Sequence, residues 1–131
     1  MRRLFLFATV LALLVMLTGR AGAESTSLDL YRWGNASSPK LDNVRPTDLA
    51  TYKHDGQDWV EAKSGGISVF STDTGEKNTW KLPKGTAYAA KLFIFNDHDN
   101  HWSIQPSVNM TLVEYQALLR ELGARFVKVP R

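Results

Sequence analysis

The spacing of apolar residues changes once along this chain, just after Pro106, and that change limits the folds open to it. From there to Gly123 the apolar residues recur every three or four positions, which is the spacing of one face of an α-helix. These residues are Leu112, Tyr115, Leu119 and Leu122. Thr111 and Glu114 have the spacing of a capping box, and Gly123 is typical of a helix end. A single helix is therefore predicted between them.

Ahead of Pro106 the sequence consists of short segments typical of strands, separated by turns. The predicted strands are Leu28–Trp33, Ile67–Phe70, Thr79–Leu82, Ala89–Phe95 and His101–Gln105, with Arg125–Val129 as a closing strand after the helix. Ala89–Phe95 is apolar enough to be a central strand buried on both faces. Asn96–Asn100 is expected to be a hairpin tip, and Pro46–Asp48 to open a short helix. Strands first and one late helix, without βαβ alternation, predict an α+β fold with mainly antiparallel pairing.

Residues 1–23 have the pattern of a secretory signal peptide. Arg2 and Arg3 precede an almost uninterrupted apolar run of 14 residues, Leu4–Leu17, and Ala21-Gly22-Ala23 matches a cleavage site. The run is shorter than the roughly 18 to 20 residues of a helix that crosses a bilayer. We therefore expect a secreted or periplasmic protein whose residues 24–131 form a single domain. An uncleaved membrane anchor is the alternative.

Removal of this segment changes the charge of the protein. The chain has 16 basic and 13 acidic residues, a formal net charge of +3. Three of the basic residues and none of the acidic ones lie within residues 1–23, so the remainder is formally neutral. The charge therefore does not indicate nucleic-acid binding. Because the chain has no cysteine, the domain must be stabilised by its core without disulfides.

Three predicted strands each carry one polar residue among bulky neighbours, namely Arg32, Ser68 and His101. Arginine is suited to bidentate contact with a phosphate. Gly65-Gly66 would let the backbone near Ser68 approach a ligand closely. Phe70 and Trp102 would offer a flat apolar wall to a planar ring. Each feature also has an ordinary structural explanation, because strand faces routinely alternate in this way.

Taken in order, these segments resemble those of the ADP-ribosyltransferase toxins first known as type VI secretion effectors. The matching segments are Leu30–Arg32, Gly65–Phe70, Pro83–Thr86 and His101–Pro106, followed by Met110 and the predicted helix. The resemblance spans roughly residues 28 to 122. It implies an ADP-ribosyltransferase-like fold, in which two small and mainly antiparallel β-sheets form a cleft for NAD, with one clear late helix.

The resemblance also implies roles for individual residues. Arg32 would hold an NAD phosphate or ribose. Ser68, which follows Gly66, would frame the nicotinamide ribose, and Phe70 would pack near the nicotinamide. His101 and Gln105 would lie where these enzymes place the group that steers the attacking nucleophile. The implied partners are NAD, as a substrate, an unknown macromolecular acceptor, and a cognate immunity protein.

Two positions depart from the family pattern. Ile67 stands where the family toxin has threonine, and Gln105 stands where many ADP-ribosyltransferases have glutamate. A glutamine amide can bond a ribose hydroxyl, but it carries no charge to stabilise an oxocarbenium ion. A secreted binding module without catalysis, on the same fold, therefore stays open as an alternative.

Two further hypotheses rest on the histidines. A nuclease-like toxin would use His54 and His101 as acid and base, although the neutral domain argues against it. The segment Asp97–His101 has residue types that suit a divalent ion, but a polar hairpin tip is commonly only a turn, and no metal site is predicted. No Ser-His-Asp arrangement is visible in the sequence.

Overall fold

The computed structural model describes residues 23–131 of the chain. The predicted signal peptide, apart from Ala23, lies outside the described residues. Within residues 23–131 no helix is long and apolar enough to cross a membrane.

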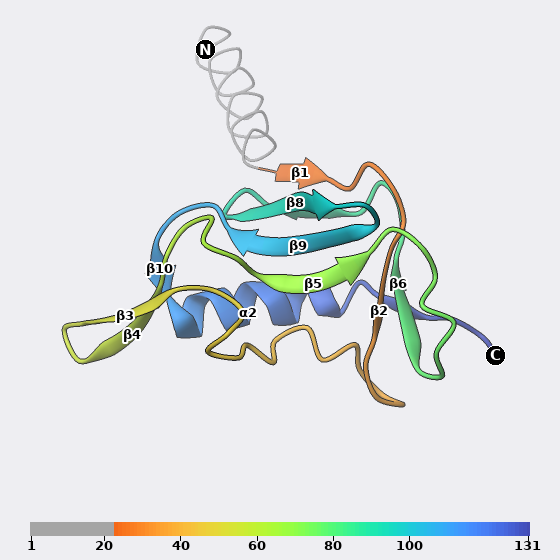
Figure 1. The fold of residues 1–131 in the computed structure, drawn as a ribbon, viewed down its shortest axis with the longest axis horizontal. Helices are drawn as coiled ribbons and strands as arrows, with labels where there is room; N and C mark the ends of the chain where they lie inside the picture. The colour runs from red at the N-terminus through yellow and green to blue at the C-terminus, as the bar shows by residue number, and fades with distance from the viewer. Residues whose placement is uncertain (1–22) are drawn as a thin grey trace, which may run out of the picture.

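The centre of the molecule is a six-stranded antiparallel sheet with one helix against it (Figure 1). Its strands lie in the order β11 (Val127–Lys128), β6 (Thr79–Leu82), β2 (Leu30–Trp33), β5 (Ile67–Phe70), β9 (His101–Pro106) and β8 (Leu92–His98). A second sheet contains β10 (Met110–Thr111), β4 (Gln57–Val60) and β3 (Thr51–His54), and β1 (Ala23–Ser25) pairs with β7 (Ala87–Ala89). The helix is α2 (Leu112–Gly123). The predicted α+β class with antiparallel pairing is confirmed.

One face of the central sheet forms the core with α2. Ile67 and Val69 of β5 and Ile104 of β9 are almost fully buried, as are Tyr115 and Leu119 of the helix. Because side chains alternate along a strand, the residues between them point to the other face. The antiparallel register pairs Ser68 with Ser103 and Phe70 with His101. Polar and aromatic side chains of both strands therefore meet on the face away from the core.

The predicted helix is confirmed at both ends. The Thr111 hydroxyl accepts a hydrogen bond from the backbone N–H of Glu114 at 3.1 Å, and the helix ends at Gly123. Only this half of the expected capping box forms. The Glu114 carboxylate instead accepts a 2.7 Å hydrogen bond from Lys91, which ties the first turn of α2 to the segment before β8.

The prediction for the strand at Ala89–Phe95 is wrong in position and environment. β8 begins at Leu92 and runs to His98, so only Asp99 and Asn100 form the hairpin tip. It is an edge strand of the sheet, and Phe95 is 45% exposed. An apolar composition does not distinguish a central strand from an edge strand whose outer face carries aromatic residues.

The segment between β2 and β5 also differs from the prediction. Pro46–Asp48 forms a turn, in which the Asp48 N–H donates to the Arg45 carbonyl at 3.0 Å. The short helix that was expected to begin here does not form. The chain continues into the β3–β4 hairpin, whose turn residues Asp55 and Gly56 both have positive φ. Asp-Gly is typical of the turn in a two-residue hairpin, so the sequence contains a local signal for this hairpin beyond the strands predicted above.

Tyr115 anchors the helix to the sheet, and its replacement by phenylalanine tests that contact. The hydroxyl donates a 2.5 Å hydrogen bond to the Ile104 carbonyl, and burial raises the pKa of the phenol. Tyr115→Phe removes this donor from a buried carbonyl. We expect the free energy of unfolding, measured in urea at pH 7, to fall by about 1–2 kcal/mol.

The same variant has an expected pH dependence. Because folding raises the pKa of Tyr115, the neutral phenol stabilises the fold fully below about pH 10 and progressively less above it. The stability difference between wild type and Tyr115→Phe should therefore shrink as the pH rises above 10. A difference that stays constant over that range would contradict this assignment.

Candidate active site

Two adjoining cavities lie on the face of the central sheet away from the core. The smaller, of about 280 Å³, is lined by the turn Arg45–Asp48 and by Ser68, Asp97, His101 and Ser103, among others. The larger, of about 320 Å³, is lined by Arg32, Trp33, Asn43, Arg45, Ser68 and Phe70. Since Arg45 and Ser68 line both, the cavities meet at these two residues. Their volumes suit parts of one small-molecule ligand.

Ser68, His101 and Asp97 form a line of polar contacts at this meeting point. The His101 Nε2 lies 3.0 Å from the Ser68 Oγ, and the His101 Nδ1 lies 2.7 Å from the Asp97 Oδ2. The sequence shows no Ser-His-Asp pattern, but the fold brings these three residue types into contact. The three residues come from β5, β9 and β8, and only strand pairing brings them together.

A β-bulge in β8 places Asp97 against His101. Asn96 pairs with Trp102 and His98 pairs with His101, so Asp97 is an extra residue in the ladder. A bulge sets two residues opposite one. Here Asp97 contacts the Nδ1 edge of His101, while the His98 ring stacks on the His101 ring with 5.1 Å between centroids.

Arg32 lies in the wall of the larger cavity, but backbone carbonyls hold its guanidinium. β2 and β5 share one residue pair, Tyr31 with Phe70. Arg32 donates hydrogen bonds to three backbone carbonyls. One of them is the Ser68 carbonyl, at 2.8 Å, on the side of β5 where pairing with β2 is minimal. Burial lowers the pKa of this guanidinium. Arg32 therefore stabilises the backbone of the site and has only its remaining N–H groups for a ligand.

Arg45 lines both cavities, and the sequence alone does not single it out. Its side chain is 66% exposed, and its Nη2 lies 2.9 Å from the Asp48 carboxylate. That hydrogen bond and charge raise the pKa of Arg45. The same carboxylate accepts the Arg45 backbone N–H at 2.7 Å, which fixes the turn. No local pattern marks a loop arginine of this kind, because its position depends on the fold of the turn.

An aromatic wall borders the larger cavity. The Trp33 ring stacks on Phe70 with 5.6 Å between centroids, and Phe70 makes a T-shaped contact with His101 with 5.5 Å between centroids. The prediction that Trp102 contributes to this wall is wrong. Trp102 pairs with Val69 and packs against the core, since it alternates with His101 along β9.

Gly65 and Gly66 line the smaller cavity, yet chain packing explains their lack of side chains. A Cβ on Gly66 would lie 2.2 Å from the Ile104 carbonyl oxygen, and one on Gly65 would lie 2.3 Å from the Asp48 carbonyl oxygen. Gly65 also has a φ of +141°, which disfavours any other residue. Packing against the neighbouring backbone therefore explains both glycines, in place of the close approach of a ligand that the sequence suggested.

Gln105 lines neither cavity. It is buried, and its Nε2 donates a 2.7 Å hydrogen bond to the Ser103 Oγ, which in turn contacts the Asp97 carboxylate at 3.4 Å. His54 is exposed on β3, in the second sheet, beside Asp55. The structure thus links Gln105 to His101 indirectly and does not pair His54 with it. Among residues 23–131, no group of three or more acidic or histidine side chains is arranged to hold a metal ion.

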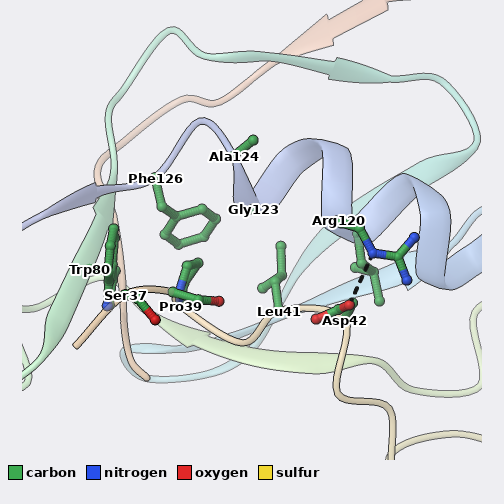
Figure 2. Close-up of a pocket in the computed structure, with 11 residues that line it drawn as sticks. Ser37, Pro39, Leu41, Asp42, Trp80, Arg120, Gly123, Ala124 and Phe126 are labelled. Carbon is green, nitrogen blue, oxygen red and sulfur yellow. Dashed lines mark hydrogen bonds and ion pairs between the residues drawn. The ribbon is translucent and has the colours of Figure 1, made fainter. Parts of the chain in front are cut away.

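A separate cavity of about 290 Å³ lies beside the C-terminal end of α2 (Figure 2). Its apolar walls come from Pro39, Leu41, Trp80, Leu119 and Phe126. Its charged residues, Asp42 and Arg120, form an ion pair with 3.2 Å between Oδ2 and Nε. None of the site residues selected from the sequence lies here, and the acid and the base neutralise one another.

A family model described as the Tse2 ADP-ribosyltransferase toxin matches residues 28–130. The chain belongs to this toxin family. The match confirms the resemblance noted in the sequence, and it extends from β2 to β11, so it contains every residue of the two adjoining cavities. A search of curated proteins gives no match.

The packing role of Gly66 is testable by substitution. Gly66→Ala would push a methyl group into the backbone of β9, which cannot move without disturbing the β5–β9 ladder. We expect the free energy of unfolding to fall by about 3 kcal/mol or more. Gly75→Ala is the matched control, because Gly75 has a φ of +75° but open space around it, and should cost only about 1 kcal/mol. Equal losses in the two variants would argue against the packing role.

Proposed function

We propose that this chain is an exported toxin that transfers ADP-ribose from NAD to a macromolecular acceptor, on an ADP-ribosyltransferase-like fold. In this proposal residues 1–23 direct export and residues 24–131 form the toxin domain. One observation supports it most strongly. In a member of an ADP-ribosyltransferase toxin family, four residues selected from the sequence surround two cavities that meet at Ser68. They are Arg32, Ser68, Phe70 and His101.

The cavities offer complementary contacts to the parts of NAD. The rings of Phe70 and Trp33 provide an apolar wall for the nicotinamide. The Ser68 hydroxyl, between the two cavities, is placed to bond the nicotinamide ribose. The exposed guanidinium of Arg45, assisted by the free N–H groups of Arg32, supplies positive charge for the pyrophosphate.

The reaction needs little covalent chemistry from the protein. The bond between the ribose C1″ and the nicotinamide nitrogen breaks, and nicotinamide leaves as a neutral molecule. A nucleophile of the acceptor forms the new bond to C1″, and its proton passes to the Nε2 of His101 when that atom is unprotonated. Orientation and electrostatic stabilisation then supply most of the rate enhancement. Gln105 acts behind this site, by holding Ser103 and through it Asp97.

Labelled NAD tests the function directly. The exported protein, incubated with NAD labelled in the adenosine part and with a cell lysate, should release nicotinamide and attach label to an acceptor. Ser68→Ala should abolish both signals with the fold preserved, as checked by circular dichroism. Binding of NAD without any nicotinamide release would instead favour the non-catalytic binding module, and the absence of NAD binding would contradict the proposed transfer.

Arg45→Ala tests the proposed pyrophosphate contact. Loss of a charge-assisted hydrogen bond should raise the KM for NAD by about 10- to 100-fold. Arg120→Ala is a matched control, because Arg120 is also exposed and paired with an aspartate, but lines the cavity beside α2. It should leave the KM unchanged. An equal KM in the two variants would show that Arg45 does not contact the pyrophosphate. Arg32→Ala is less informative, since it also releases three backbone carbonyls.

A further inference from the structure

The Nδ1 atom of His101 is out of contact with solvent and makes no aligned hydrogen bond. The Asp97 Oδ2 lies 2.7 Å from this atom. An ionised carboxylate has only acceptor atoms. At this distance an unprotonated Nδ1 would set its lone pair against a carboxylate oxygen, whereas a protonated Nδ1 is attracted to it. The neutral ring of His101 is therefore favoured with its proton on Nδ1.

The other nitrogen of the ring faces the cavity. The Nε2 lies 3.0 Å from the Ser68 Oγ, at the point where the two cavities meet. With the proton on Nδ1, the Nε2 lone pair is available, and the Ser68 hydroxyl donates to it. A nucleophile that enters the cavity displaces this hydrogen bond, and the freed Nε2 lone pair then accepts its proton.

Asp97 is held in place from several sides. The β-bulge fixes its backbone opposite His101, and the Ser103 hydroxyl contacts its second oxygen at 3.4 Å. The His101 ring stacks with His98 and makes a T-shaped contact with Phe70. These contacts restrict rotation of the His101 ring and keep its Nδ1 edge against the carboxylate.

We propose that Asp97 is a positioning residue that fixes the tautomer of His101 and so leaves Nε2 as the proton acceptor in the cavity. The effect on turnover rests on the proposed transfer reaction, whereas the tautomer does not. The bulge supplies the carboxylate, and burial of Nδ1 excludes water as its partner. The contact with Ser68 places Nε2 where the two cavities meet.

Nitrogen-15 NMR of the histidine rings in the exported protein tests the tautomer. The 15N shifts of neutral His101 should show the proton on Nδ1 in the wild type. Asp97→Asn preserves the shape but introduces an amide that can donate to Nδ1, so the proton should move to Nε2 in all or part of the population. Asp97→Glu keeps a carboxylate and should retain the wild-type tautomer.

Asp99→Asn is the matched control. It makes the same change of charge in the same hairpin, and asparagine tolerates the positive φ of 47° at this position. Its His101 shifts should equal those of the wild type. A wild-type proton on Nε2, or an unchanged tautomer in Asp97→Asn that melts like the wild type, would overturn the proposal. If Asp97→Asn does not fold, the wild-type and Asp97→Glu spectra still decide the tautomer.

Kinetics test the consequence for the reaction. Asp97→Asn should lower the kcat for nicotinamide release by about 100-fold or more, because a general base contributes at least that much, while the KM for NAD stays nearly constant. Asp97→Glu should recover part of the rate. A displaced tautomer with an unchanged kcat would show that Asp97 has no part in turnover. A wild type that releases no nicotinamide would refute the proposed function, while the NMR result would still decide the tautomer.

Discussion

The pairing of β5 with β9 is the interaction on which both the core and the cavities depend. In this ladder Ile67 lies opposite Ile104 in the core, and Ser68 lies opposite Ser103 on the other face. A shift of one residue would exchange the two faces, placing hydroxyls in the core and isoleucines in the cavity. Gly66 limits such a shift, because the Ile104 carbonyl oxygen occupies the space of its missing side chain. The requirement for a dry core thus determines which residues line the cavities.

The other side of β5 has the opposite property, since pairing with β2 is reduced to one residue pair. A strand that separates from its neighbour leaves carbonyl groups without partners, and buried unpaired carbonyls are costly. Arg32 resolves this by donating to the Ser68 carbonyl and to two carbonyls of the following loop. The separation that creates the larger cavity is therefore stabilised by an arginine that lines it. This accounts for an arginine on the strand without assigning all of its charge to a ligand.

The parts of the site that the sequence predicted are those governed by local periodicity. Alternation along short strands drew attention to Ser68 and His101, the family resemblance gave them and Phe70 their expected roles, and helical spacing predicted α2. The parts it missed depend on pairing or on turns. Asp97 stood out only as a residue of a polar hairpin tip, because a bulge is defined by the partner strand. Arg45 enters the site through the turn fixed by Asp48, and Trp102 was assigned to the wrong face.

The effect of having glutamine rather than glutamate at position 105 also depends on where this residue lies in the fold. From the sequence, a glutamine in place of glutamate removes a negative charge from the reacting centre. In the structure Gln105 is buried behind Ser103, and the smaller cavity already contains the carboxylates of Asp97 and Asp48. A further carboxylate at position 105 would lie behind Ser103, whose hydroxyl contacts Asp97, and would add like charge in a region of low solvent access. An amide there can donate to Ser103 and supports Asp97 without competing with it. The absence of a glutamate on β9 therefore does not leave the site without negative charge, because β8 supplies it.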